Sequence, residues 1–286
     1  MIRATANAEG PIFTMHASVA GPVVYLDSWA IYNLAEGDAS RRRRFIAALN
    51  SGMDLLFSVT NAAELAGPKG ASADAARVFL DAIGPRWFPA ELSPIDVIQR
   101  EVTGQCGASA CIAERFLKSY AAHRIRSYAP GSGKVIDLSP DFFRLGGLLE
   151  YLGLQRESIL AGSQKFDSLL RTKVAMVRER CNRNQKWLDA RFPRVPFDPS
   201  FPATFIFKNL LRVMIDEETL RPGDGMDFCH AVTAGAFASF AALDKRWKRR
   251  VGSLPKPNRL ARIYGPSELD QMVADMELWL EHRAAS

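Results

Sequence analysis

Residues 23–28 read VVYLDS, and this stretch decides the fold. Its first four residues are apolar and rich in β-branched and aromatic side chains, which predicts a short buried strand. Asp27 stands at the carboxyl end of that strand. Ser28 is a residue type that commonly caps a helix, and we expect a helix from there through Leu34. A buried strand that leads directly into a helix is typical of the first unit of an α/β protein.

The same succession of strand and helix recurs along the chain. Residues 54–59 predict a second apolar strand, after which Thr60 or Asn61 is expected to cap a helix that carries Glu64. Further strands are expected at 87–88, 240–243 and 261–264, and further helices over 40–50, 72–83, about 226–237 and near the C-terminus to about 281. This alternation predicts a mainly parallel sheet with helices on both faces.

Between residues 95 and 220, long helical patterns replace the strands, most clearly over residues 165–188. The chain is therefore expected to have three parts. They are an N-terminal arm (1–20), an α/β domain (21–94 and 221–286) and a large helical insertion (95–220). The insertion holds 19 Lys and Arg residues against 14 Asp and Glu residues.

The composition excludes several classes of protein. The chain has 286 residues, of which 48% are hydrophobic and 24% charged, as in ordinary globular domains. Its four cysteines form no C-x-x-C pair, which argues against a zinc ribbon and suits a reducing compartment. No stretch reaches the roughly 18 apolar residues of a membrane span, and residues 1–20 lack the pattern of a signal peptide. We therefore expect a cytoplasmic protein that makes no use of a membrane.

Four acidic residues are expected to lie close together at the carboxyl-terminal edge of the predicted sheet. Asp27 and Asp244 each follow an apolar strand, and open parallel sheets bind ligands beyond the carboxyl ends of their strands. Glu64 lies on the helix after the second strand, and Asp227 starts the helix that precedes Asp244. Converging carboxylates repel one another unless a hard divalent cation such as Mg²⁺ or Mn²⁺ joins them. Such a cation binds phosphate oxygens and activates water.

The motifs that carry these acids resemble those of the PIN domain nucleases. They are VYLDS at 24–28, SVTNAAEL at 58–65, DFCHA at 227–231, FAALD at 240–244 and RIYGPSE at 262–268. The resemblance covers about residues 23–90 and 224–280 and leaves out the insertion.

The resemblance implies a PIN-like α/β fold and a metal-dependent endoribonuclease that hydrolyses phosphodiester bonds to give 5′-phosphate and 3′-hydroxyl ends. Ser28 and Thr60 would then hydrogen-bond metal-bound water or a carboxylate, although helix capping explains both equally well. A toxin or defence-type RNase is one such enzyme, and an antitoxin-like protein or a homodimer is then the partner to consider. The residues it implies as catalytic groups and as ligands of Mg²⁺ or Mn²⁺ are Asp27, Glu64, Asp227 and Asp244.

Two other functions stay open at this point: a structure-specific DNA nuclease, and a catalytically idle PIN-like module that binds nucleic acid or a protein. The family often has Thr or Ser just before its fourth acid, whereas Ala242 and Leu243 precede Asp244. We therefore expect Asp244 to contact the cation more weakly or through water.

The remaining charged features are less specific. The formal net charge of +6 permits a polyanionic partner without requiring one. Two basic runs, residues 41–44 and 245–250, can either contact phosphates or form solvated helix surfaces. His230, one turn after Asp227, is expected to be a packed histidine rather than a catalytic base.

Overall fold

The computed structural model describes residues 2–6, 13–17, 19, 21–67, 69–105, 107–128, 143–181, 184–217, 219–255 and 260–284. Its centre is a five-stranded parallel sheet with the strand order β5-β4-β3-β6-β7. The strands are β3 (Val23–Leu26), β4 (Asp54–Ser58), β5 (Trp87–Ala90), β6 (Phe240–Ala242) and β7 (Arg262–Tyr264). The predicted α/β class and the parallel sheet are confirmed.

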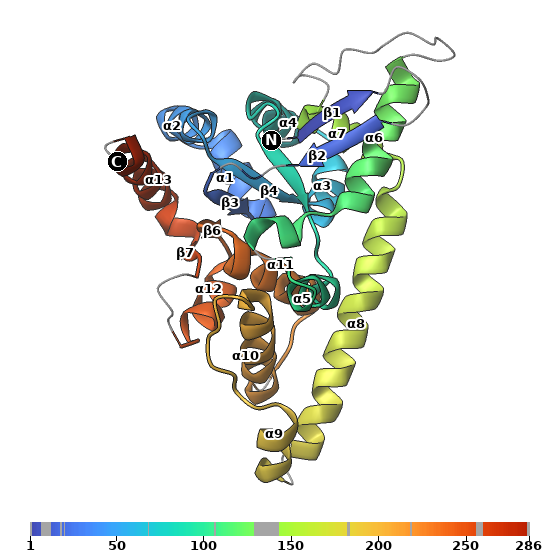
Figure 1. Ribbon diagram of the computed structural model, residues 1–286, viewed down its shortest axis with the longest axis vertical. Helices are drawn as coiled ribbons and strands as arrows, with labels where there is room; N and C mark the ends of the chain where they lie inside the picture. Colours follow the sequence, from blue (N-terminus) through green and yellow to red (C-terminus); the bar gives the residue numbers. More distant parts are fainter. Residues whose placement is uncertain are drawn as a thin grey trace.

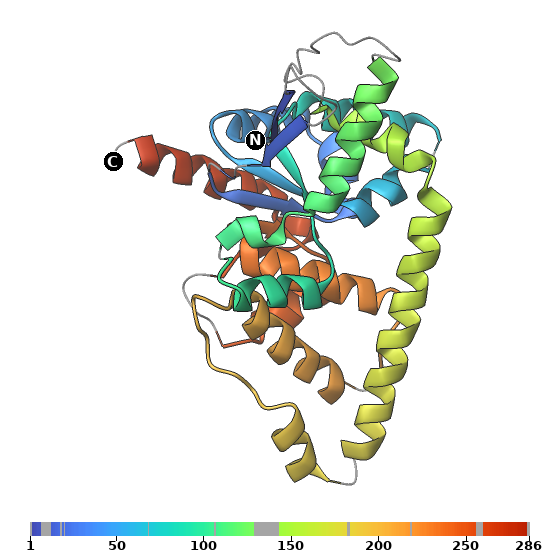
Figure 2. The same cartoon turned by 45° about the vertical axis from the view of Figure 1, so that its right-hand side comes forward.

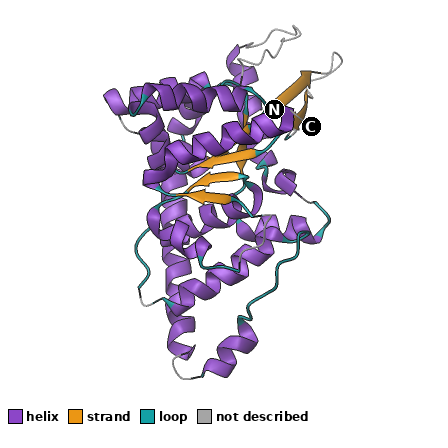
Figure 3. Ribbon diagram, turned by 90° about the vertical axis from the view of Figure 1, so that its left-hand side faces the viewer, coloured by secondary structure: helices purple, strands orange, loops and turns teal. Residues whose placement is uncertain are grey.

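Helices cover both faces of this sheet (Figure 3). The side chains of β3 alternate between two hydrophobic cores, because Val24 and Leu26 belong to one core and Val23 and Tyr25 to the other. The first core is closed by α1 (Ser28–Glu36), α2 (Ala39–Asn50), α3 (Val59–Ala66), α4 (Ala71–Ala82), α7 (Leu145–Gly153) and α13 (Leu269–Ala284). The second is closed by α5 (Pro94–Val102), α10 (Pro202–Asp216), α11 (Asp224–Phe237) and α12 (Lys245–Gly252).

The described part of residues 95–220 is helical, as predicted, but it packs closely on the α/β core. Its helices α6 (Glu114–Tyr128) and α7 join the first core, while α5 and α10 join the second. The helix expected over 165–188 is two helices, α8 (Arg156–Cys181) and α9 (Gln185–Arg191). Asn184 explains the second start, because its side chain caps α9 by accepting a hydrogen bond from the Trp187 N–H at 3.0 Å.

Helix α8 runs along one side of the molecule, from the level of the sheet to α9 (Figures 1 and 2). On its way it contacts α3, α10 and α11, so that it bridges elements from both halves of the α/β domain. Within the ranges described, no helix has both the length and the apolar character needed to cross a bilayer.

The N-terminal segment, expected to be an arm, contains a β-hairpin. Strands β1 (Ile2–Ala6) and β2 (Phe13–Ala17) pair in antiparallel fashion, with Ala4 opposite Met15. Apolar and polar residues alternate in both strands (IRATA and FTMHA), but each alternation spans five residues. So short a pattern predicts a strand only weakly, which is why the hairpin was missed.

Candidate functional site

The sheet reverses its winding direction between β3 and β6. From β3 the chain continues to β4 and β5 on one side, and β6 and β7 lie on the other side. The carboxyl ends of β3 and β6 therefore form a topological switch point, the usual ligand site of open α/β sheets. Asp27 directly follows β3 and donates its backbone N–H to Ala242 O at 3.1 Å, while Asp244 comes two residues after β6. The two acids are thus held at the same edge of the sheet.

Asp27, and not Ser28, caps α1. Its Oδ1 accepts a hydrogen bond from the Ser28 N–H at 2.7 Å. The Ser28 hydroxyl is therefore available for another partner, and it donates to Oε2 of Glu64 on α3 at 2.7 Å. The expected capping by Ser28 is wrong for a simple reason: Asp is an equally good cap and stands one position earlier. As a result, Ser28 connects the acid after β3 with the acid after β4.

Helix α3 brings Glu64 to this edge, but its start differs from the prediction. The cap is Ser58, whose Oγ accepts from the Asn61 N–H at 2.9 Å, rather than Thr60 or Asn61. Thr60 lies buried in the first turn, and no hydrogen bond among the described residues joins it to the four acids. The structure thus brings Ser28 to the acids, while Thr60 stays apart from them.

Asp227 lies in the first turn of α11, which begins at Asp224 and not near Met226. Gly223, the N-cap, has a φ of +97°, a left-handed conformation that glycine adopts readily. Oδ2 of Asp227 accepts a hydrogen bond from Nε1 of Trp247 at 3.1 Å. Asp224, the first residue of α11, has a buried carboxylate that pairs with Arg246.

Asp244 is the N-cap of α12. Its Oδ1 accepts hydrogen bonds from the backbone N–H groups of Arg246 at 2.7 Å and Trp247 at 2.8 Å. A capping role leaves the second carboxylate oxygen, Oδ2, without a hydrogen bond from the described residues. Asp244 thus supports α12 and presents one oxygen to other groups.

The acids influence one another electrostatically. Burial raises the pKa of Asp27 from 3.8 to about 6, and the negative charges of Glu64 and Asp244 add to this effect. Burial likewise raises the pKa of Asp227 from 3.8 to about 7, helped by Asp27 and Asp244. Asp27 is therefore close enough to Glu64 and Asp244, and Asp227 close enough to Asp27 and Asp244, for those charges to disfavour its ionisation. The structure brings together all four acids that the sequence singled out.

The donor set suits a hard divalent cation, although the side chains do not form a finished coordination shell. In the described ranges, no group of three or more His, Cys, Asp or Glu side chains is arranged to hold a metal ion. In each of the four acids, one oxygen accepts hydrogen bonds from described donors and the other accepts none. Those other oxygens, together with the mutual repulsion, are what a cation such as Mg²⁺ or Mn²⁺ would use and relieve.

Tyr25, Asn61 and His230 form a buried polar cluster next to Asp27 that no sequence pattern predicted. Asn61 donates to the Leu26 carbonyl at 3.0 Å and to the Tyr25 hydroxyl at 3.4 Å, and that hydroxyl is also hydrogen-bonded to Nδ1 of His230. Burial lowers the pKa of His230 to about 4, so the ring is neutral near pH 7. The expectation of a packed histidine is confirmed. This group fixes the end of β3 from which Asp27 projects.

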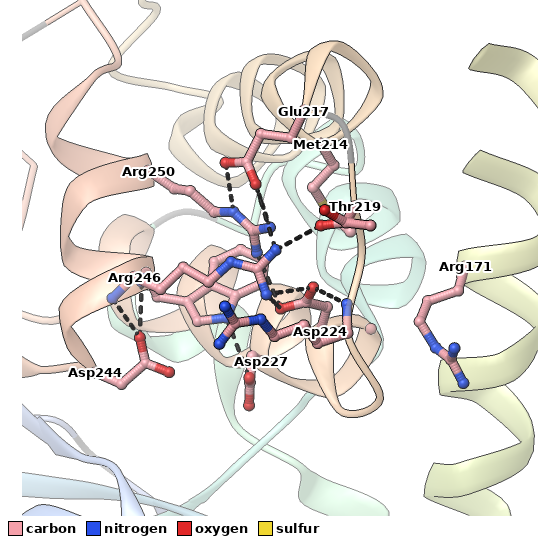
Figure 4. Close-up of polar contacts among 12 residues, drawn as sticks. Arg171, Met214, Glu217, Thr219, Asp224, Asp227, Asp244, Arg246 and Arg250 are labelled. Carbon is pink, nitrogen blue, oxygen red and sulfur yellow. Dashed lines mark hydrogen bonds and ion pairs between the residues drawn. The ribbon is translucent and has the colours of Figure 1, made fainter. Parts of the chain in front are cut away.

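The two basic runs are largely occupied by contacts within the protein. Arg41 forms an ion pair with Asp270 at 3.1 Å, and Arg44 pairs with Glu277, so that this run ties α2 to α13. In the second run, Arg246 and Arg250 point into a cluster with Asp224 and Glu217, close to Asp227 and Asp244 (Figure 4). Lys248 pairs with Glu268, whereas Lys245 and Arg249 are exposed.

The chain matches no protein-family model, no curated protein and no solved structure. Any statement about its function therefore rests on the site itself and on the motifs that carry it.

Proposed function

We propose that this protein is a metal-dependent endoribonuclease that hydrolyses phosphodiester bonds at the carboxylate cluster. One observation carries the proposal: Asp27, Glu64, Asp227 and Asp244 converge at the switch point of the sheet, and burial and mutual repulsion raise the pKa of Asp27 and Asp227. Keeping several carboxylates partly buried and close together is costly, and a cation that binds phosphate oxygens gives this arrangement a use.

In this proposal the four acids hold one or two Mg²⁺ or Mn²⁺ ions. When bound, the metal lowers the pKa of a water molecule and stabilises the negative charge that develops on the phosphate. The Ser28 hydroxyl orients the Glu64 carboxylate through its 2.7 Å hydrogen bond. The two capping bonds at Asp244 and the Trp247 bond at Asp227 keep these carboxylates in place as substrate binds.

The resemblance to PIN domain nucleases supports RNA as the substrate, with 5′-phosphate and 3′-hydroxyl products, in the cytoplasm. A toxin or defence-type RNase is the form of the proposal that includes an antitoxin-like protein, or a second copy of the chain, as partner.

The proposal is tested by incubating the protein with labelled RNA and DNA, both single-stranded and structured, in Mn²⁺, in Mg²⁺ and in EDTA. We expect cleavage of RNA that needs the cation and that is lost in Asp27→Asn. Cleavage confined to branched or flapped DNA would instead support the DNA nuclease. Full activity in EDTA would contradict any metal-dependent reading.

A second candidate is a catalytically idle module that binds nucleic acid or a protein. Two observations favour it: Asp27 and Asp244 both have a structural role as helix caps, and the described acids form no ready metal-holding group. This candidate predicts no cleavage of any substrate and, where the module binds RNA, binding that is equally strong with and without Mn²⁺.

A further inference from the structure

Trp247 is fixed on more than one side. Its side chain is buried, the Arg250 guanidinium lies 4.3 Å from its ring centroid, and the Phe228 ring is 6.3 Å away, centroid to centroid. Its Nε1–H, the single polar group of the side chain, is directed to Oδ2 of Asp227 at 3.1 Å. The indole therefore presents one donor, in a fixed orientation, to one acid of the candidate site.

The Arg250 guanidinium is itself held by a fully formed ion-pair cluster (Figure 4). Arg250 donates from Nε and Nη2 to Glu217 at 2.8 and 2.7 Å and from Nη1 to Asp224 at 3.2 Å. Arg246 donates to both oxygens of Asp224 at 2.8 and 2.7 Å and to the Thr219 carbonyl at 2.7 Å. Two cations and two anions thus balance, and an unpaired charge on the buried Arg250 or Asp224 would be very unfavourable.

Helix α12 contacts two acids of the site through one residue, Trp247, whose backbone N–H and side chain each donate a hydrogen bond. Asp244 begins the helix and accepts from the Trp247 backbone N–H at 2.8 Å, while the Trp247 side chain donates to Asp227 at 3.1 Å. One residue therefore sets where Asp227 lies relative to Asp244. Packing alone does not require this bond, since an apolar ring could contact Phe228 and Arg250 without donating a hydrogen bond.

We propose that Trp247 is a positioning residue, whose indole N–H, backed by Arg250, orients the Asp227 carboxylate so that its second oxygen faces the cation. This inference rests on the proposed function, because it assigns Asp227 the role of a metal ligand. The bond to a group that orients a ligand is worth about 10–100-fold in metal affinity in other metal sites.

The test uses Trp247→Phe, which keeps an aromatic ring against Phe228 and Arg250 and removes the N–H. Trp279→Phe is the matched control, because Trp279 also lies under an arginine, Arg283 at 5.5 Å, but on α13. Mn²⁺ affinity is measured by calorimetry for wild type, both variants and Asp27→Asn, together with thermal melts in EDTA. We expect Trp247→Phe to bind Mn²⁺ about 10–100-fold more weakly and Trp279→Phe to bind as wild type.

A second measurement does not depend on the folding of Trp247→Phe. In ¹H–¹⁵N spectra of the metal-free protein, the indole resonance of Trp247 should move in Asp227→Asn, and Mg²⁺ should move it again in the wild type. The Trp279 resonance should stay in place in both experiments. A Trp247 indole resonance that shifts neither in Asp227→Asn nor on addition of Mg²⁺ would overturn the positioning role.

The outcomes separate the inference from the proposed function. If wild type binds Mn²⁺, Asp27→Asn does not, and Trp247→Phe binds as wild type, then Trp247 only packs and the inference is wrong while the metal site stands. If folded wild type binds no Mn²⁺ at all, the proposed function fails and the positioning role fails with it.

Discussion

Asp27 and Asp227 carry the electrostatic cost of the site. Both are largely shielded from solvent and both lie near other carboxylates, which raises their pKa values to about 6 and about 7. A carboxyl group whose pKa is higher in the folded than in the unfolded state binds its proton more tightly when folded. The stability that Asp27 and Asp227 contribute to the metal-free protein should therefore fall as the pH rises from about 4 through 7, the opposite of the usual behaviour of an ion-paired acid.

Asp227→Asn removes one of these charges, so we expect it to stabilise the metal-free protein at pH 8. Each pKa unit corresponds to about 1.4 kcal/mol, which gives a gain of up to a few kcal/mol that should vanish near pH 4. Thermal melts in EDTA at several pH values measure the difference, in which the titration of other groups, such as His230, cancels. A variant that is less stable than wild type at pH 8 would contradict the electrostatic picture.

Asp244 is expected to matter less for activity than Asp27. Its Oδ1 is occupied by two backbone N–H groups, and Ala242 and Leu243 before it offer no hydroxyl to hold metal-bound water. Asp244→Asn should cost about 10–100-fold in activity, as changes around metal ligands do, whereas Asp27→Asn should lose nearly all of it. Asn caps a helix as well as Asp does, so both variants should fold.

Kinetics of the two Asn variants across a Mn²⁺ titration measure this difference, with Mg²⁺ as the second cation. We expect Mn²⁺ to support activity better than Mg²⁺. Mg²⁺ demands near-ideal octahedral geometry, whereas Mn²⁺ binds more readily to a site with a weak ligand such as Asp244. Equal losses in Asp27→Asn and Asp244→Asn at every Mn²⁺ concentration would refute the weaker role of Asp244.

Helix α12 shows how a basic stretch of sequence divides once it is folded. Of its cations, Arg246, Lys248 and Arg250 have acidic partners, and only Lys245 and Arg249 are exposed. These two are one helical turn apart, and Lys245 directly follows Asp244. If RNA phosphates approach the acids, this is the cationic surface of α12 that remains for them.

The double variant Lys245→Gln/Arg249→Gln should bind RNA more weakly and with a flatter salt dependence. The expected change in log–log slope is roughly 0.7 per lost contact to single-stranded RNA. Lys173→Gln/Lys186→Gln is the matched control: it removes the same charge from exposed positions of α8 and α9. Equal slopes for wild type and the α12 variant would show that this surface does not contact RNA phosphates. A flatter slope for the control alone would instead place the phosphate contacts on the insertion.

At the scale of elements, β3, β4, β5 and β6 were predictable because each is a short, mainly apolar run buried on both faces. The residues at which helices begin were harder to predict. Where two capping residues are neighbours, as at Asp27 and Ser28, local propensity does not choose between them.

The four acids could be proposed from sequence because each follows a strand, starts a helix or lies on the helix after a strand. The contacts that hold these acids in place could not be predicted in this way. The bond from Trp247 to Asp227 and the ion pairs of Arg246 and Arg250 join residues 20 or more positions apart. The sequence shows only six residues, KRWKRR, whose partners are set by tertiary packing.

The helical insertion belongs to the architecture of the site. Asp167 on α8 is buried and accepts a hydrogen bond from the Gly225 N–H, in the first turn of α11, at 2.7 Å. A side chain at Gly225 would have its Cβ 2.8 Å from Cα of Asp167, so the two helices can approach this closely only with glycine there. Because Gly223 offers no side-chain cap, the insertion supplies the capping carboxylate for the helix that carries Asp227.

Asp167→Ala should therefore lower both the stability and the Mn²⁺ affinity of the protein. Leaving the buried Gly225 N–H without an acceptor costs about 1–3 kcal/mol, which thermal melts will detect. Asp74→Ala, an exposed acid in the first turn of α4, is the control and should cost no more than about 1 kcal/mol. An Asp167→Ala variant that matches this control in both measurements would show that α8 does not support the site.

The most direct test of the central claim is calorimetric titration of the metal-free, full-length protein with Mn²⁺, beside Asp27→Asn. If the four carboxylates form a cation site, the wild type binds one or two Mn²⁺ ions, and Asp27→Asn, which should melt in EDTA at or above the wild-type temperature, binds none or far more weakly. Absence of binding to folded wild type, or the same affinity in both proteins, would contradict the account.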